Sequence, residues 1–212
     1  MTISSQVFVL GALRNNSFVI FDEESKRACV IDPTTSDSIL NFLHEKSLIL
    51  EHVLITHAHF DHIGGVEGIR KAYISNPPKV AMHATDKDLW LQGAGAGSLG
   101  YKFFAGELPD MDIEHKQKIQ CGNYLLEVRH TPGHTPGHVV YYSQDLSAVF
   151  CGDLIFQNGI GRTDFIGGDE EILYKSIREQ IFTLPDATIL FPGHGQSTSI
   201  AREKVNNPYL LI

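Results

Sequence analysis

The sequence Thr56-His57-Ala58-His59-Phe60-Asp61-His62 follows directly after the apolar run Val53-Leu54-Ile55. Such a run is typical of a buried strand, so the polar stretch begins where that strand is expected to end. Three imidazoles and a carboxylate this close together are costly to bury unless a cation satisfies them. The stretch therefore predicts a metal site at the end of a core strand.

Three further motifs place polar side chains at the ends of other predicted strands. They are Thr131-Pro132-Gly133-His134, Cys151-Gly152-Asp153 and Phe191-Pro192-Gly193-His194-Gly195. The glycine before each polar residue allows the backbone to bend sharply and to approach an ion without a Cβ clash. Together with the first stretch, these motifs supply enough nitrogen and oxygen ligands for two metal ions.

We expect the ligands to divide between the two ions. The first ion would be held by His57, His59 and His134, the second by Asp61, His62 and His194, and Asp153 would bridge them. These ligands suit divalent zinc, iron or manganese, with zinc the first candidate. Two ions about 3.5 to 4 Å apart lower the pKa of a bound water and polarise a carbonyl oxygen, which predicts hydrolysis by a metal-bound hydroxide. Asp61 is expected to be catalytic as well, because its carboxylate can orient that hydroxide through a hydrogen bond.

The remaining chain alternates short apolar strands with amphipathic helical patterns. Strands are predicted at residues 7–10, 17–21, 28–31, 80–82 and 188–191, with hairpin turns at 122–123 and 144–145. Helices are predicted after Ser36, after Gly65, near Thr85, and from Asp169 with Ile172, Leu173, Ile177 and Ile181 on one face. The order of strands followed by helices occurs twice, which predicts an α/β fold of two facing sheets with helices outside, a four-layer αββα sandwich. No linker divides the chain, so residues 1–212 are expected to form one domain.

The composition excludes several classes of partner. The chain has 25 acidic and 17 basic residues and a net charge of -8, with no basic run to neutralise a phosphate backbone, so nucleic acid is not an expected partner. No apolar stretch reaches the roughly 18 residues of a membrane span, and the N-terminus lacks the pattern of a signal peptide. The three cysteines form no CxxC pair. We therefore expect a cytoplasmic protein that acts on a small molecule without contacting a membrane.

The four motifs together resemble those of the metallo-β-lactamase superfamily, and the resemblance covers nearly the whole chain. Within the superfamily the chain is similar to the short, single-domain type II glyoxalases, the hydroxyacylglutathione hydrolases. This narrower likeness rests on Gly161-Arg162-Thr163-Asp164-Phe165, on Gly167-Gly168-Asp169 and on Asn207-Pro208-Tyr209. The resemblance implies an αββα sandwich with the metals at one edge, and hydrolysis of the thioester S-lactoylglutathione to lactate and glutathione.

One departure from that family concerns substrate binding. Full-length type II glyoxalases have a C-terminal helical domain that supplies much of the glutathione pocket, whereas only 18 residues follow His194 here. The carboxylates of glutathione would then need cations from the metal-binding domain itself. Arg162 is the first candidate, because its planar guanidinium pairs bidentately with carboxylates. A structural pair of Arg162 with Asp164 or Asp169 is the alternative.

Two other functions stay open at this point. Persulfide dioxygenases of the superfamily share a stretch like residues 161–165, and that resemblance implies one iron held by His57, His134 and Asp153. A metallohydrolase with another ester or thioester substrate is the second. Amide hydrolysis is disfavoured because an amine is a poor leaving group, whereas a thiol with a pKa near about 8.5 leaves without a general acid. The zinc β-lactamases also carry a cysteine in place of Asp153 and a lysine in place of Phe156.

Overall fold

The computed structural model describes residues 2–210 and contains two six-stranded sheets. The first sheet has the order β1 (Ile3–Leu10), β2 (Asn15–Asp22), β3 (Arg27–Ile31), β4 (Ile49–Leu54), β5 (Lys79–Met82) and β6 (Met111–Asp112). Its first three strands are antiparallel, whereas β3 to β6 run parallel. Parallel neighbours need a crossover connection, and the helical segments between these strands provide it.

The second sheet is built mainly from hairpins. Its order is β14 (Thr198–Ser199), β13 (Ile189–Pro192), β10 (Ala148–Gly152), β9 (Val139–Ser143), β8 (Tyr124–His130) and β7 (Lys118–Cys121). All neighbours are antiparallel except β10 and β13, which are parallel and are joined through a helical segment. A small ribbon of β11 (Ile155–Phe156) and β12 (Gly159–Ile160) follows β10.

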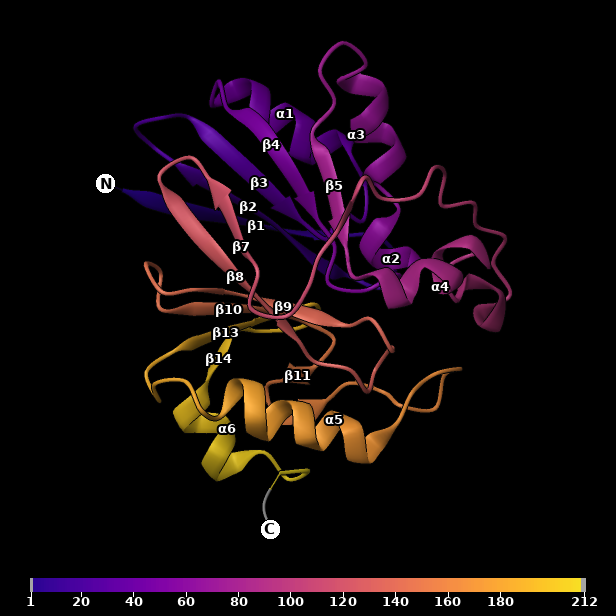
Figure 1. Ribbon diagram of the computed structural model, residues 1–212, viewed down its shortest axis with the longest axis vertical. Coiled ribbons are helices and arrows are strands. Elements are labelled where there is room, and N and C mark those ends of the chain that lie inside the picture. Colours follow the sequence, from indigo (N-terminus) through magenta and orange to yellow (C-terminus); the bar gives the residue numbers. More distant parts are fainter. Residues whose placement is uncertain (1, 211–212) are drawn as a thin grey trace.

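Helices cover the outer faces of both sheets, as Figure 1 shows. The first half contributes α1 (Asp37–Glu45), α2 (Phe60–Ile63), α3 (Val66–Ala72), α4 (Lys87–Leu91) and the short 3₁₀ segments η1 (Ala84–Asp86) and η2 (Ala96–Leu99). The second half contributes α5 (Glu170–Ser176), its π-helical continuation η3 (Ile177–Ile181) and α6 (Ile200–Asn206). The two sheets lie between these helical layers, so the predicted four-layer αββα sandwich is confirmed.

Strand β2 explains why four layers form. All eight of its residues are buried, and its side chains alternate between two apolar clusters. Val19 and Phe21 pack with Ile39 and Leu43 of α1, whereas Phe18 and Ile20 belong to the cluster between the sheets. A strand whose side chains are apolar on both faces requires cover on both sides. A third cluster fills the space between the second sheet and its own helices, with Leu173, Ile177 and Ile200 among its members.

One predicted helical face differs from the structure. Leu173, Ile177 and Ile181 are fully buried, as expected, but Ile172 is 43% exposed. The backbone amide of Ile172 donates a hydrogen bond to the carboxylate of Asp169, the N-cap residue. The first turn is therefore fixed by its cap, and the packed face begins one residue later.

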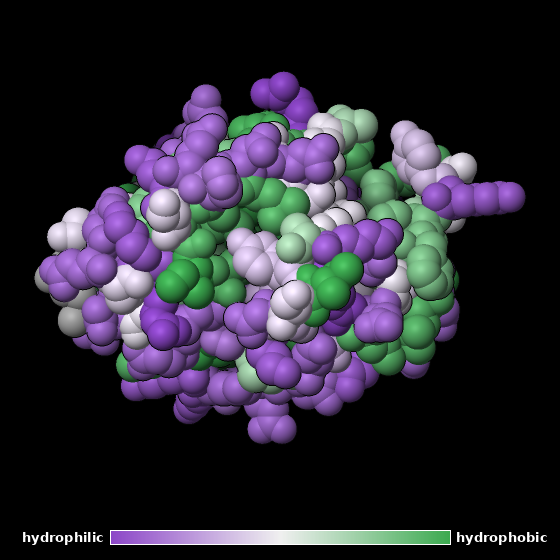
Figure 2. Space-filling model, turned by 90° about the horizontal axis from the view of Figure 1, so that it is seen from above, coloured by the Kyte–Doolittle hydropathy of each residue, from purple (hydrophilic) through white to green (hydrophobic). Residues whose placement is uncertain are grey.

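The outer surface of the helical layer that contains α1 and α3 is mostly polar. Figure 2, which views the molecule from this side, shows hydrophilic side chains over most of the face, with smaller apolar areas between them. Among residues 2–210, no helix is both long and apolar enough to cross a membrane.

Candidate metal centre

The predicted ligands come from segments that lie far apart in the sequence and meet at one edge of the sandwich. Residues 56–62 follow β4, His134 follows β8, Asp153 follows β10 and His194 follows β13. The Gly193 amide donates to the Gly152 carbonyl at 2.7 Å and so joins two of these segments directly, and the Asn16 amide of β2 donates to the Gly193 carbonyl at 2.6 Å. Backbone contacts between strand ends therefore position the site.

The structure brings the ligand atoms together in two neighbouring groups. His57, His59 and His134 form the first group, and Asp61, His62 and His194 form the second, with the ligand atoms of each group within 4.8 Å of one another. Nδ1 of His59 lies 2.9 Å from Nε2 of His134, and Nε2 of His194 lies 3.2 Å from the Asp61 carboxylate. A third group with the same spacing, Asp32, His57 and His62, shares one histidine with each of the first two.

The carboxylate of Asp153 lies between the two groups. One of its oxygens is 3.8 Å from Nε2 of His134 in the first group and 3.6 Å from Nε2 of His194 in the second. Its other oxygen is 3.5 Å from Nε2 of His62. A carboxylate that reaches both groups has the placement of a bridging ligand.

Several buried atoms at this edge fit a metal ion. Nε2 of His57, Nε2 of His62 and one carboxylate oxygen of Asp153 are buried and form no hydrogen bond. Buried polar atoms without partners are rare, because each costs about 1 to 3 kcal/mol. All three belong to the proposed ligand set and are nitrogen or oxygen donors of the kind that zinc, iron and manganese bind. The donor set of the site therefore fits divalent metal ions.

The other ring nitrogen of four histidines is held by a hydrogen bond that fixes the orientation of the ring. Nδ1 of His134 donates to the Arg162 carbonyl at 2.7 Å, and Nδ1 of His194 donates to the Leu13 carbonyl at 3.0 Å. Nδ1 of His62 donates to Asp32 at 2.8 Å, and Nδ1 of His57 lies 3.0 Å from the Thr56 hydroxyl. Because Nδ1 carries the proton in these bonds, Nε2 is left as the metal-binding atom.

Asp32 and Asp86 are functional residues that sequence reasoning missed. Asp32 is buried and also accepts hydrogen bonds from the Thr56 amide and hydroxyl. Its position directly after a core strand, the same as that of the ligand motifs, is a signal that could have identified it. Asp86 accepts hydrogen bonds from the Ala58 amide at 3.0 Å and the Gly137 amide at 2.6 Å, and so joins two ligand-bearing loops. No comparable sequence signal marks Asp86.

His138 also contributes to the site from behind the ligands. Its side chain is fully buried, and its Nε2 accepts a hydrogen bond from the Asp153 amide at 3.2 Å. Its Nδ1 lies 2.9 Å from the hydroxyl of Thr131. His138 therefore holds the backbone of Asp153 and is also packed in the core.

Two glycines let the backbone approach the ligands. Gly152 has a φ of +48°, a left-handed conformation that glycine adopts without strain. A Cβ atom on Gly193 would collide with the Asp153 carboxylate and lie 2.8 Å from Cε1 of His62. The glycines of these motifs are therefore required by space and by backbone conformation.

Burial keeps the first group of histidines in the neutral form that binds metals. Burial lowers the pKa of His57 well below its ordinary value, with further lowering from His62, and it lowers the pKa of His59 to about 3. Burial also lowers the pKa of His134, although Asp153 opposes the effect.

The second group of ligands is closer to carboxylates. Burial acts to lower the pKa of His62, but the charge of Asp153 and of other carboxylates outweighs it and raises the pKa.

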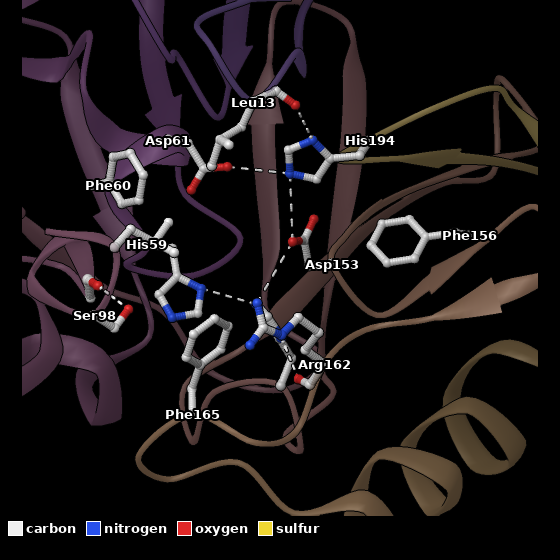
Figure 3. A pocket seen from close by; sticks show the side chains of 13 residues that line it. Leu13, His59, Phe60, Asp61, Ser98, Asp153, Phe156, Arg162, Phe165 and His194 are labelled. Atoms are coloured by element: carbon white, nitrogen blue, oxygen red, sulfur yellow. Dashed lines mark hydrogen bonds and ion pairs between the residues drawn. The ribbon is translucent and has the colours of Figure 1, made fainter. Parts of the chain in front are cut away.

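A cavity of about 400 Å³ opens onto both groups of ligands. Figure 3 shows Asp61, Asp153 and His194 on its walls, with Phe156 and Phe165 on opposite sides. His57 and His62 are fully buried and are not part of the lining. The proposed catalytic carboxylate of Asp61 therefore faces a space in which a substrate can bind.

Arg162 also lines this cavity, but its guanidinium already has partners. It forms a bidentate pair with Asp164 at 2.9 and 2.8 Å, and it stacks on the ring of Phe165 at 4.3 Å from the centroid. Both charged side chains are largely exposed, at 60% and 67%. The structural pair left open by the sequence is thus formed in this structure.

Several relatives share most of the chain. A "Probable metallo-hydrolase YqgX" of Bacillus subtilis is 37% identical, covering 95% of this chain and 94% of the relative. A "Hydroxyacylglutathione hydrolase GloC" of Haemophilus influenzae is 33% identical, covering 97% of each protein. The mitochondrial persulfide dioxygenase of Bos taurus is 34% identical, covering 92% of this chain and 71% of the relative.

Solved structures and a family model give the same assignment. The crystal structure of the B3 metallo-beta-lactamase BLEG-1 has a TM-score of 0.92 and 33% identity, covering 98% of this chain and all of the other. The protein TTHA1623, crystallised in a di-iron-bound form, has a TM-score of 0.86 and 32% identity, covering 97% and 100%. The model of the metallo-beta-lactamase superfamily matches residues 10–194. Because this match includes most strands of both sheets and every predicted ligand, the chain belongs to the metallo-beta-lactamase superfamily, as its motifs predicted.

Proposed function

We propose that this protein is a hydrolase of thioesters, with glutathione thioesters such as S-lactoylglutathione as the first substrate class, and that it uses two divalent metal ions. The observation that carries the proposal is the position of the Asp153 carboxylate, within 3.8 Å of histidines from both ligand groups. A carboxylate between two sets of three ligands can bind an ion in each set, whereas a site for a single ion would not need it there.

Each residue has a defined role in this proposal. His57, His59 and His134 would hold one ion, Asp61, His62 and His194 the other, and Asp153 both. When bound, two such ions activate water and polarise a carbonyl oxygen. Burial acts to raise the pKa of Asp61, but the charge of His62 and a hydrogen bond from His194 outweigh it and lower the pKa. These causes act in the metal-free site; a bound cation would likewise favour the charged form, so Asp61 would be ionised at neutral pH and could accept a hydrogen bond from the attacking water.

The lining of the cavity favours a good leaving group. Among the described residues that line it, the titratable side chains are proposed metal ligands and Arg162. An arginine stays protonated at neutral pH and cannot supply a proton to a departing amine. A thiol with a pKa near about 8.5 leaves as the thiolate and needs no such proton. The lining of the cavity therefore favours thioesters over amides, including β-lactams, as substrates.

Arg162 is proposed to bind a carboxylate of the thiol carrier. Its pair with Asp164 is exposed, and exposed ion pairs contribute only about 0 to 1 kcal/mol. A substrate carboxylate can therefore replace Asp164 at small cost. The loop from Gly161 to Phe165, which carries Arg162, would then hold the carrier beside the cavity.

Release of free thiol from S-lactoylglutathione by the purified, metal-loaded protein tests the proposal. The assay compares the wild type with Asp61→Ala at equal metal content, and with Asp145→Ala, a control at an exposed carboxylate on the turn after β9. We expect rapid release that Asp61→Ala reduces by about 100-fold or more and that the control leaves unchanged.

Two further substrates separate the other activities known among the relatives. Oxygen uptake with glutathione persulfide, by protein containing one iron per chain, would replace the proposal with a dioxygenase. Faster turnover of a chromogenic cephalosporin than of any thioester would replace it with a lactamase.

A further inference from the structure

We propose that the site prefers thioesters with an apolar acyl group larger than lactoyl, and that Leu13 and Phe156 form the subsite for that group. This inference rests on the proposed thioester hydrolysis and adds the acyl specificity of the same site. The inference follows from two connected cavities, one of which is apolar at its Phe156 end while the other is lined by several polar side chains.

The cavity above the ligands continues into a second one. The second cavity has a volume of about 570 Å³ and shares His59, Gly95, Ser98 and Phe165 with the first. Three of these residues, His59, Ser98 and Phe165, lie on one side of the first cavity in Figure 3. One substrate can therefore extend through both spaces, with its reacting carbonyl beside the metal ligands.

The opposite end of the first cavity is apolar. Phe156 lies beside His194 there, with 6.3 Å between the ring centroids. The backbone carbonyl of Leu13 accepts the hydrogen bond from Nδ1 of His194, and its side chain lines the cavity on the other side of that histidine, near Asp61 (Figure 3). Figure 3 shows Phe156 on the far side of Asp153 from His59 and Phe165. Two side chains that flank a ligand in this way would contact the substrate immediately next to its carbonyl carbon.

The first cavity offers little to a hydroxyl group on the acyl chain. Of its described polar lining residues outside the ligand set, Ser98 donates its hydroxyl to the Gly95 carbonyl and Arg162 is paired with Asp164. Figure 3 shows Ser98 on the His59 side, and Arg162 is assigned to the carrier, so neither would meet a lactoyl hydroxyl at the Phe156 end, and that hydroxyl would lose its hydrogen bonds to water. An alkyl chain in the same place would bind more tightly, by about fourfold in affinity for each methylene group that it buries.

The second cavity suits the thiol carrier. It is the larger of the two, and its walls include the polar side chains of Thr85, Asp88, Gln92 and Asp164. A carrier such as glutathione contains amides and an ammonium group, which can bind to these side chains. Its carboxylate would bind to Arg162, whose partners Asp164 and Phe165 are part of the wall of the second cavity. The carrier would occupy this polar space, so the acyl group would point toward Leu13 and Phe156.

A series of glutathione thioesters tests the acyl subsite. The carrier stays constant while the acyl group changes from lactoyl and acetyl to butyryl and hexanoyl, and kcat/KM is measured for each with metal-loaded protein. We expect kcat/KM to rise by about fourfold for each added methylene until the cavity is filled, so that hexanoyl exceeds lactoyl by at least about tenfold.

Variants assign the preference to the named residues. Phe156→Ala and Leu13→Ala should each lower the ratio of kcat/KM for hexanoyl over lactoyl. Phe104→Ala, at a side chain that is 87% exposed and outside both cavities, should leave the ratio unchanged.

The possible outcomes separate the two proposals. Failure to release thiol from every thioester overturns both the proposed function and the subsite. Thiol release that is fastest with lactoyl, or independent of chain length, overturns the subsite alone. A steep dependence on chain length that both alanine variants retain shows that other residues select the acyl group, and overturns the assignment to Leu13 and Phe156.

Discussion

The carboxylate of Asp32 lies 2.8 Å from Nδ1 of His62, on the opposite side of the imidazole ring from the Nε2 atom that faces the site. The same oxygen accepts the Thr56 hydroxyl at 2.6 Å, and that hydroxyl lies 3.0 Å from Nδ1 of His57. A single buried carboxylate thus orients one histidine from each ligand group.

Asp32→Asn should weaken metal binding by about 10- to 100-fold. One carboxylate oxygen accepts from the Thr56 hydroxyl and His62 and the other from the Thr56 amide, and an amide nitrogen in place of either oxygen cannot accept. Competition with a chromogenic chelator measures the affinity. Asp22→Asn is the matched control, because Asp22 is equally buried in the first sheet but its partners include Ser25 and Asn123, away from the site. Equal loss of metal affinity in both variants would mean that folding, and not ligand orientation, is responsible.

Gly193→Ala should lower the metal content of the purified protein. The added methyl group would displace the Asp153 carboxylate or the His62 ring, both of which it would touch. Gly97→Ala is the control, because no atom lies within 4 Å of a Cβ built at Gly97. Metal analysis after dialysis measures the outcome, and full occupancy in Gly193→Ala would show that the ligands tolerate the displacement.

Asp86→Ala should reduce the free energy of unfolding by about 2 to 5 kcal/mol, because it leaves the buried amides of Ala58 and Gly137 without their acceptor. Urea denaturation of the metal-free protein measures this effect without a contribution from bound ions. Asp112→Ala, which removes an exposed pair with Lys87, should cost less than about 1 kcal/mol. Similar midpoints for the two variants would contradict the role given to Asp86.

Much of the site could be predicted because its ligands stand next to glycines at the ends of apolar runs. That arrangement is local in sequence, so His134, Asp153 and His194 could be grouped with the residues after β4 without knowledge of the fold. The fold could be predicted for a similar reason, since strands such as β2 are apolar on both faces and require two covered sides.

The positions of the other residues at the site depend on tertiary contacts. Asp32 reads as part of a turn before Pro33, and only the packing of β3 beside β4 brings it to Thr56 and His62. Leu99 comes from a glycine-rich stretch that carries no periodic pattern, yet the short η2 segment places it in the wall of the cavity. Leu13 reaches the site from the turn after β1. Leu13 and Leu99 have no sequence signal before the chain is folded, and the strand-end position of Asp32 does not identify its partners.

The stability of the protein should fall as the pH decreases from about 6.5 to about 4, in part because of His83. Burial and the neighbouring His130, whose ring stacks on it at 4.1 Å, lower the pKa of His83 from 6.5 to about 4. Between these values the unfolded chain binds a proton that the folded chain does not, so unfolding becomes more favourable as the pH falls. Above pH 6.5 the contribution of this group to stability is fully present.

His83→Asn tests this assignment, because asparagine can still accept the hydrogen bond that Nδ1 of His83 receives from the Thr85 amide but does not titrate. Urea midpoints at pH 5, 6 and 7.5 should show a shallower pH dependence than in the wild type. His44→Asn, at an exposed position in the last turn of α1, is the control. An unchanged slope in His83→Asn would assign the pH dependence to other groups.

The number of metal ions bound by each chain tests the central claim most directly. Native mass spectrometry of the protein loaded with zinc, iron or manganese should show two ions for the wild type. His194→Ala removes one ligand from the second group only, and should reduce the count to one at limiting metal. A single ion in the wild type, or an unchanged count in His194→Ala, would contradict a centre in which Asp153 links two complete ligand groups.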